Sequence, residues 1–349
     1  YQFKHPTTNK RGVTLVELLV VIIIIGILFA ILLPVINSVR KRGQITAISL
    51  ELQNLKSAVE QYKQTYGDYP PDGSNWLVMQ RHIMVAFPRI SPNELEVFHR
   101  LVRVPGSLAT YMDPSEALVF FLGGFSDDPR FPFTGEGGPF SANRSTGLFE
   151  FDTQRLTIDT DNLCRIQLTD LNQSIPIAGA SIDEATIHGE LGEDYVTNNC
   201  TLQRQTGPNN WQTYSNPKID VFPAYLPENA EVPYVYFDSR TYITRTQYGY
   251  DENGKYCAQY PKNNSQVRGL VRPFRSDVVA HARPDDIYPA KFIGDSSFQI
   301  ISAGIGNNFG TWDPDGGLWK HFPSGENYSS GDESNIASFS RGALEDELP

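Results

Sequence analysis

Residues 10–36 read KRGVTLVELLVVIIIIGILFAILLPVI, and this stretch decides how the chain is built. From Leu18 to Ile36 it holds nineteen residues without a formal charge. At about 1.5 Å per residue, such a helix nearly crosses a hydrocarbon core about 30 Å thick, and Val13–Val16 make it long enough. One carboxylate, Glu17, lies near its start. An ionisable group inside a membrane segment is costly, so we predict a function for Glu17.

Two simpler interpretations explain the apolar stretch less well. A secretory signal peptide has a shorter apolar region with a small-residue cleavage site behind it, whereas here the sequence LPVIN follows. An ordinary signal anchor needs hydrophobicity only, so it gives Glu17 no role. The carboxylate therefore points beyond simple anchoring.

The sequence GVTLVEL, which begins at Gly12, resembles the processing site of type IV pilins and type II secretion pseudopilins. The resemblance implies that a prepilin peptidase cuts after Gly12 and that the new first residue, Val13, is N-methylated. Glu17 falls where this family carries its glutamate, and Gly26 and Pro34 fall where it has a helix-softening glycine and proline. Val13 departs from the phenylalanine or methionine that is more usual at its position.

The chemistry of this motif predicts self-assembly. Cleavage frees an α-amino group at Val13, and a neighbouring subunit's amino group would neutralise a Glu17 carboxylate stranded in the membrane. Such head-to-tail pairing repeats without closing and generates a helical filament. Pro34 removes one backbone donor, so with Gly26 it marks a segment able to stretch when subunits pack; a simple kink is the alternative.

The helical pattern continues beyond the membrane run. Apolar residues recur mostly at three- and four-residue steps; they are Ile45, Ile48, Leu52, Leu55, Ala58, Val59 and Tyr62. Gly67 and Pro70-Pro71 then end the helix. The sequence predicts one helix from Val13 to about Tyr66, roughly 80 Å long at about 1.5 Å per residue.

The resemblance implies an α+β, pilin-like fold, with a long, half-transmembrane N-terminal helix packed on a C-terminal antiparallel β-sheet domain. Residues 1–12 are then a prepilin leader, 13–66 the transmembrane and spine helix, and 67–349 an extracytoplasmic globular domain. Residues 124–230 are rich in Gly, Pro, Asn and Asp and are predicted to be a large loop-rich insertion.

Local signals place further elements in the globular domain. Helices are predicted to start at Ser91 and Asp113, each followed by Pro and then by Glu three residues on. The best strands are Val232–Asp238, Tyr242–Thr246 and Phe298–Ser302, which are β-branched and aromatic. The runs PSEALVFFLGG, PYVYFDSR and FQIISAGIGNNFG resemble segments of large pseudopilins of the type II secretion protein G-like kind.

A calcium site is implied by the same resemblance, because major pseudopilins hold calcium between two C-terminal turns. Here the first turn is Ser302–Gly310, and Gly306 replaces the family's aspartate. The second turn offers Asp332, Asn335 and Ser338 as ligands for a cation that takes six to eight oxygens. The alternative is a turn held by hydrogen bonds among Asn307, Asn308 and Asp332.

Three cysteines, Cys164, Cys200 and Cys257, lie in the part assigned outside the cytoplasm. One disulfide and one odd thiol are possible there, and spacing does not choose the pair; Cys164–Cys200 is the pairing we predict. No CxxC and no histidine cluster accompany them, which argues against zinc.

Enzymatic and nucleic-acid functions find little support. The net charge of −11 argues against a nucleic-acid partner. The six histidines are scattered, and no GxSxG, HExxH or P-loop is present, so we predict no enzyme. Carboxylates distant in sequence leave a glycosidase-type site open.

The sequence therefore favours a pilin-like structural subunit of an envelope filament, first of all a type II secretion pseudopilus. The alternatives are a type IV pilus subunit and a membrane-tethered binding or carbohydrate-active domain that uses a pilin helix as its anchor. Implied partners are other copies, other pilin-like subunits, the prepilin peptidase and an inner-membrane assembly platform.

Basic residues flank the apolar run on both sides, so charge alone does not orient it. The resemblance implies a single-pass inner-membrane protein with a cytoplasmic N-terminus and a periplasmic C-terminal domain, extracellular in a pilus.

Overall fold

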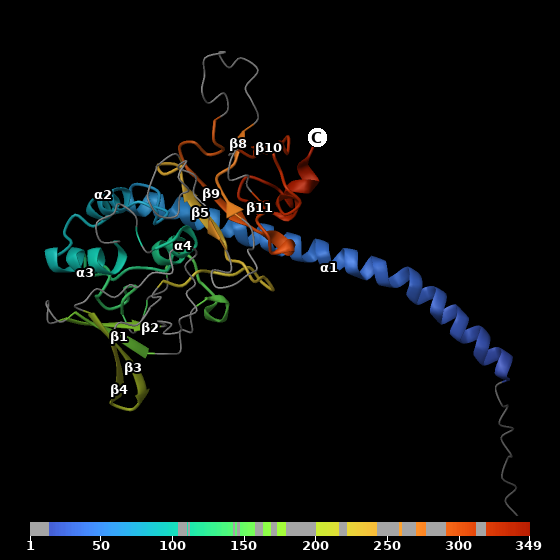
Figure 1. The fold of residues 1–349 in the computed structure, drawn as a ribbon, viewed down its shortest axis with the longest axis horizontal. Helices are drawn as coiled ribbons and strands as arrows, with labels where there is room; N and C mark the ends of the chain where they lie inside the picture. The colour runs from blue at the N-terminus through green and yellow to red at the C-terminus, as the bar shows by residue number, and fades with distance from the viewer. Residues whose placement is uncertain are drawn as a thin grey trace, which may run out of the picture. The chain divides into compact units, whose positions relative to one another are not determined.

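The computed structural model of the chain describes thirteen stretches, which form two compact units, Tyr1–Gln44 and Ile45–Pro349. The described residues are 14–103, 110, 112–141, 144, 147–157, 163–168, 173–178, 200–215, 222–242, 258–259, 270–276, 291–311 and 319–349. Helix α1, Leu15–Tyr66, belongs to both units (Figure 1). The prediction of one continuous helix is confirmed, including helical backbone at Gly26 and Pro34.

The described part of the first unit is the apolar half of α1. Its large hydrophobic side chains are solvent-exposed, between 38% at Ile36 and 80% at Leu15. The most apolar 18-residue window has a mean hydropathy of 3.4. Among the described residues, α1 is the one helix long and apolar enough to cross a membrane. Such an apolar surface does not suit water, so it needs lipid or other protein around it.

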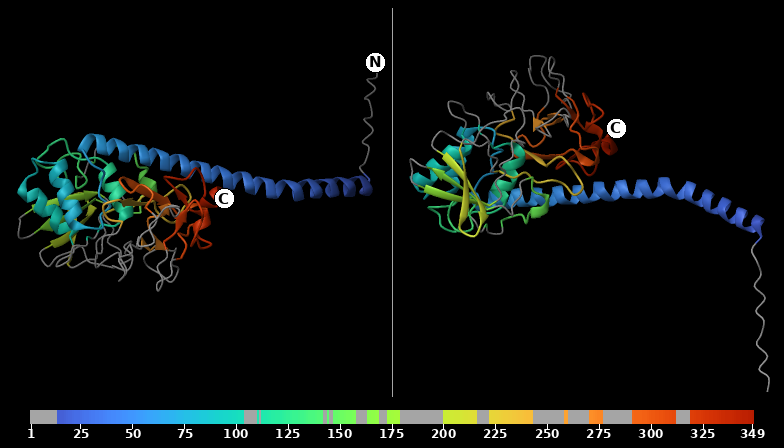
Figure 2. Two further views of the ribbon diagram at one scale, coloured as in Figure 1. Left: turned by 90° about the horizontal axis from the view of Figure 1, so that it is seen from above. Right: turned by 60° about the horizontal axis from the view of Figure 1, so that its bottom comes forward.

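The second unit contains the remaining helices, which are α2 (Trp76–Ala86), α3 (Pro92–Val102) and α4 (Pro114–Leu122). In Figure 2, α2 and α3 gather near the C-terminal end of α1. The predicted helix starts are confirmed. Asp113 forms a complete capping box with Glu116, whereas Ser91 precedes α3 without a side-chain capping bond.

The central sheet has three antiparallel strands in the order β11-β9-β5. They are β5 (Val235–Asp238), β9 (Phe298–Ser302) and β11 (Ile336–Ala337). Every residue of β5 and β9 is buried, so protein covers both faces of these strands. Two of the three predicted strands are thereby found, and 243–246 lie outside the described residues.

A second antiparallel sheet, in the order β2-β1-β3-β4, lies within the predicted insertion. Its strands are β1 (Leu163–Leu168), β2 (Gln173–Ala178), β3 (Cys200–Gly207) and β4 (Asn210–Ser215). Short pairs elsewhere are β6 (Ala258–Gln259) with β7 (Leu270–Val271), and β8 (Arg275–Ser276) with β10 (His321–Phe322). The 3-10 turns are η1 (Thr153–Arg155), η2 (Gly304–Gly306), η3 (Asp332–Ser334) and η4 (Leu344–Glu347).

The register of β1 and β3 bears on the predicted disulfide. Cys164 lies opposite Arg204, and Cys200 lies opposite Leu168. The two cysteines are therefore four positions apart along neighbouring strands, about 14 Å at about 3.4 Å per residue, whereas bridged Cα atoms lie within about 7 Å. Their pairing requires a shift of this register. Their side chains and Cys257 lie outside what the structure describes, so the disulfide stays a prediction.

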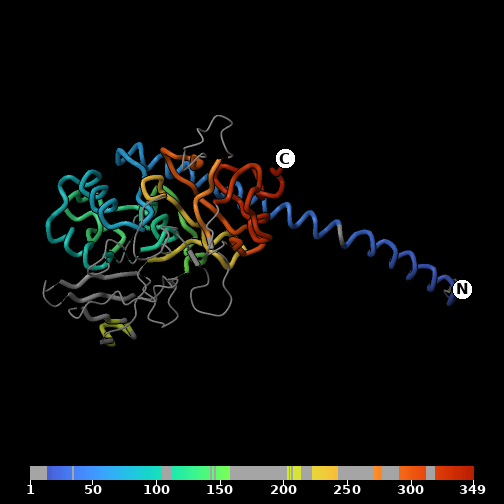
Figure 3. Tube along the Cα trace, turned by 45° about the horizontal axis from the view of Figure 1, so that its top comes forward, coloured from blue at the N-terminus to red at the C-terminus, as the bar shows by residue number. Residues whose placement is uncertain are grey.

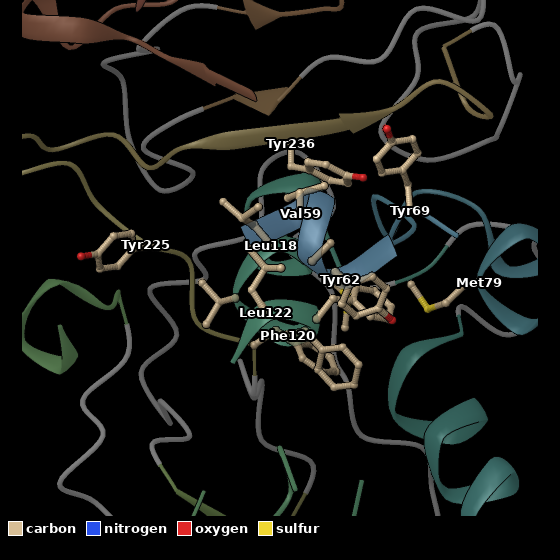
Figure 4. Packing of buried hydrophobic residues seen from close by; sticks show 14 of the residues in the cluster. Val59, Tyr62, Tyr69, Met79, Leu118, Phe120, Leu122, Tyr225 and Tyr236 are labelled. Atoms are coloured by element: carbon tan, nitrogen blue, oxygen red, sulfur yellow. The ribbon is translucent and has the colours of Figure 1, made fainter. Parts of the chain in front are cut away.

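The main core joins the spine helix, α4 and the sheet. Val59 and Tyr62 of α1 face Leu118 and Leu122 of α4, with Tyr236 of β5 above them (Figure 4). The Tyr62 hydroxyl lies 2.8 Å from Nε2 of His82 on α2. All six apolar α1 positions from Ile48 to Tyr62 that the periodicity selected are buried.

The central sheet separates this core from a second one. Successive strand residues point to opposite faces. Tyr236 and Ile300 accordingly face the main core, whereas Val235 and Ile301 face a cluster with Phe309. The C-terminal residues, red in Figure 3, wrap beside these strands and complete the second core.

Candidate assembly segment and C-terminal junction

The predicted processing site, Gly12 and Val13, lies outside the described residues, which begin at Thr14. Cleavage after Gly12 and methylation of Val13 therefore stay predictions. The structure does describe the residues that follow, and they show how the first helical turn is organised.

Thr14 and Glu17 form a capping box at the start of α1. The backbone N–H and the hydroxyl of Thr14 each donate to Oε2 of Glu17 at 2.9 Å, and the Glu17 N–H donates to Oγ1 of Thr14 at 3.2 Å. This reciprocal pattern satisfies two helix-terminal donors and holds the carboxylate at the positive end of the helix dipole. The sequence TLVE carries the capping-box spacing, which our sequence analysis did not use.

Gly26 and Pro34, the other predicted assembly residues, lie inside continuous helix. A Cβ added at Gly26 meets no atom within 4 Å, so no local packing requires glycine there. Its presence instead lowers the helix propensity of an exposed segment. Stretching between Gly26 and Pro34 in a filament stays a prediction.

Glu51 lies in the part of α1 that follows Gln44 and holds this part to the globular domain. Its carboxylate accepts two bonds from the Arg155 guanidinium at 2.8 and 2.6 Å. The hydroxyls of Tyr225 and Tyr234 donate to the same carboxylate at 3.1 and 2.6 Å. Burial next to Glu51 raises the pKa of Tyr225 to about 12, and that of Tyr234 still further. The sequence analysis missed this cluster.

A second polar cluster connects the segment after α1 to the end of β5. Asp238 is 1% exposed and accepts a bond from Nε of Arg240 at 2.6 Å. Asp72 is also 1% exposed; it accepts from Ser74 Oγ at 2.6 Å and from the Thr241 hydroxyl. Burial, opposed by Arg240 and reinforced by Asp72, raises the pKa of Asp238 to about 7.

The proposed calcium ligands are engaged in other bonds. Asp332 pairs with the Lys320 ammonium, and the Ser338 hydroxyl accepts the Ile300 N–H at 3.1 Å. Asn335 donates to the Phe309 carbonyl at 3.4 Å. Among the described residues, no group of three His, Cys, Asp or Glu side chains is arranged to hold a metal. As placed, these residues do not fit a calcium ion.

The glycine that replaces the family's aspartate has a structural reason. A Cβ built at Gly306 collides with the Ser334 hydroxyl, so a larger residue there requires the Ser334 side chain to move. The hydrogen-bonded alternative expected bonds among Asn307, Asn308 and Asp332, but each of these residues bonds to other partners instead. Asn308 accepts the Gly310 N–H at 2.8 Å, and Asn307 accepts the Glu231 N–H at 2.9 Å.

One open cavity of about 510 Å³ lies beside residues 126–136. Its lining includes Asp127, Asp128 and Glu136, together with Ser126 and Thr134. The Arg130 backbone N–H donates to Asp128 and lowers the pKa of that carboxyl, so the group is poorly suited to act as an acid.

Comparison with known proteins finds similarity at the N-terminal segment that was predicted to direct assembly. Residues 7–33 match the family described as "Prokaryotic N-terminal methylation motif". The type IV major pilin protein PilE of Neisseria gonorrhoeae is 38% identical over 68 residues, which cover 20% of this chain and 41% of that protein. A fimbrial protein of Neisseria meningitidis serogroup A is 37% identical over 68 residues, covering 20% and 40%.

Fimbrial protein EcpB of Eikenella corrodens is 46% identical over 52 residues, covering 15% of this chain and 33% of that protein. The chain thus spans about two fifths of the length of the first curated relatives it matches. No solved structure matches the chain. The chain therefore carries the N-terminal motif of type IV pilin and pseudopilin-like proteins, as its sequence predicted.

Proposed function

We propose that this chain is a pilin-like structural subunit of an envelope filament, and that this filament is a type II secretion pseudopilus. One observation carries the assignment to a filament: an exposed apolar helix with a single carboxylate in its first turn begins inside the segment that matches the methylation motif. Its apolar side chains suit first a membrane and then the packed centre of a filament.

Glu17 separates assembly from anchoring. A membrane anchor gains nothing from a carboxylate, which is costly at membrane depth. In a filament, the Val13 amine of one copy neutralises Glu17 of the next, and Thr14 keeps that carboxylate near the helix terminus until it is paired. The implied partners are further copies, other pilin-like subunits, a prepilin peptidase and an assembly platform.

The choice of a pseudopilus rests on the globular domain. The two runs that resemble large pseudopilins, PYVYFDSR and FQIISAGIGNNFG, contribute the paired central strands β5 and β9. The relatives named above favour the alternative, a type IV pilus subunit, but their similarity is limited to 15–20% of the chain. That limited match does not distinguish the two filaments.

The proposal is tested in three steps in a strain that expresses the chain. N-terminal sequencing should find methylated Val13 first, and Gly12→Trp should leave the leader attached. Cross-linking in native envelopes should join the α1 helices of neighbouring copies.

Deletion should abolish secretion of a substrate protein while leaving surface pili in place. Loss of pili with intact secretion identifies the type IV pilus instead. An uncross-linked, unprocessed membrane protein with neither phenotype contradicts filament assembly and leaves the tethered-domain alternative.

A further inference from the structure

The C-terminal junction is the place where the residue before β10 meets η3. Lys320 precedes β10, and its carbonyl accepts the Arg275 N–H at 2.9 Å, which fixes its backbone to β8. Asp332 begins η3, which leads directly into β11 of the central sheet. Side chains of Lys320 and Asp332 are each 1% exposed, and the ammonium contacts Oδ1 of the carboxylate. The pair therefore connects two separate sheets.

The Asp332 carboxylate is fully engaged. Its second oxygen, Oδ2, accepts the Ser329 N–H at 2.7 Å and the Ser329 hydroxyl at 2.6 Å. A buried ion pair is tolerated only where geometry and additional hydrogen bonds compensate the lost hydration. Here Lys320 contacts one carboxylate oxygen and Ser329 donates two hydrogen bonds to the other. These contacts compensate the lost hydration of the carboxylate.

A metal ion at the same place would lack ligands. Calcium takes six to eight oxygens. The Ala303 carbonyl of the first turn already accepts from Ser334 at 3.3 Å, and the Phe309 carbonyl accepts from Asn335. Of the expected ligand atoms, Oδ1 of Asn335 is buried without a hydrogen-bond partner among the described residues. One amide oxygen and one occupied carboxylate do not make a calcium site.

We propose that the Lys320 ammonium is the structural cation of this junction, occupying at Asp332 the place that a bound metal ion would need. The lysine is covalently part of the chain, so it needs no ion from solution. The folded protein consequently neutralises Asp332 without calcium, while the bonds from Ser334 to Ala303 and from Asn335 to Phe309 join the two C-terminal turns. This inference does not depend on which filament the chain forms.

The first test measures the metal requirement directly. Thermal unfolding of the full chain in detergent is followed with excess calcium, with excess magnesium as the ionic control, and with chelator. The melting temperature should agree within about 1 °C, because a ligand raises it only by binding the native state. A rise with calcium beyond that with magnesium, lost in Asp332→Asn, overturns the proposal.

The second test removes the lysine. Lys320→Met strands a buried carboxylate and should lower the melting temperature by roughly 5–10 °C. The double variant Lys320→Met/Asp332→Leu should recover part of that loss, because no charge remains unpaired. The matched control is Lys291→Met, whose side chain is 79% exposed and pairs with Asp295 at 3.9 Å. A Lys320→Met protein that melts like the parent contradicts the role; if that variant does not fold, the calcium comparison decides.

Discussion

At the residue scale, the C-terminal junction depends on glycines that leave no room for a side chain. Gly310 has φ +83°, and a Cβ built there collides with the carboxylate of Asp332 and the hydroxyl of Ser329. Gly304 has φ +60° and lies against the Ser334 carbonyl. The close approach of these backbones brings Asp332 into the position where Lys320 meets it.

Gly310→Ala should destabilise the protein by about 3 kcal/mol, because positive φ and steric overlap both oppose the methyl group. Gly67→Ala is the matched control. Gly67 has φ +87°, but a Cβ there meets no atom within 4 Å, so its cost of about 1–2 kcal/mol reflects conformation alone. Urea unfolding of both variants measures the difference. Equal losses show that the contact with Asp332 is relieved at no cost.

Glu17→Gln and Glu17→Ala should insert into membranes at least as well as the parent, because each removes a costly carboxylate. Both should enter filaments at least severalfold less, since the neighbour's Val13 amine loses its partner. Glu17→Asp keeps the charge, so this variant should retain part of the parent's filament assembly. Membrane fractionation and filament yield report the two effects separately. Parental assembly by Glu17→Ala favours the anchor alternative.

At the element scale, α1 has two surfaces with different roles. Residues 15–39 expose apolar side chains, whereas from Ile48 to Tyr62 an apolar stripe is buried against α4 and the central sheet. Glu51 lies in this second half and receives bonds from Arg155, Tyr225 and Tyr234. The buried apolar face and the Glu51 carboxylate therefore both hold the helix to its domain.

Glu51→Gln should lower the free energy of unfolding by about 2–4 kcal/mol, because a partly buried guanidinium and two tyrosine hydroxyls lose their charged acceptor. Glu96→Gln makes the same change in an i,i+4 pair with Arg100, where the Glu96 side chain is 42% exposed. That control should change stability by about 0.5 kcal/mol or less. Urea unfolding measures the loss of stability in each variant. Similar losses from both substitutions contradict the role of Glu51 in holding α1 to the globular domain.

Local pattern explains which of these elements could be read in advance. The length of α1, the capping box at Asp113 and the strands β5 and β9 follow from residues near one another in sequence. The Glu51 cluster could not be read, because Arg155 is 104 positions away and the tyrosines are further still. No sequence motif marks Lys320. Only the fold shows that its ammonium pairs with Asp332, which the sequence analysis had expected to bind calcium.

At the scale of the whole molecule, two buried groups give opposite pH dependences. The folded pKa of Asp238 is about 7 against an ordinary 3.8, chiefly through burial, so the folded state binds more protons between about pH 4 and 7. Its contribution therefore falls as pH rises through that window. Burial lowers the pKa of His82 from 6.5 to about 4, so its contribution rises with pH between those values. The two trends oppose each other below pH 6.5.

Substitution of Asp238 separates these trends. Asp238→Asn removes the falling component, so between pH 5 and 8 the variant should gain stability relative to the parent. Some loss at every pH is expected too, since Arg240 gives up a charged acceptor. The change with pH, rather than the offset, therefore identifies the buried carboxylate.

Asp128→Asn is the control, because that carboxyl is 42% exposed and its lowered pKa places its titration below this range. Urea unfolding at pH 5, 6, 7 and 8 gives both curves. Parallel curves for the parent and Asp238→Asn mean that Arg240 keeps Asp238 ionised throughout, and that burial does not control this end of β5.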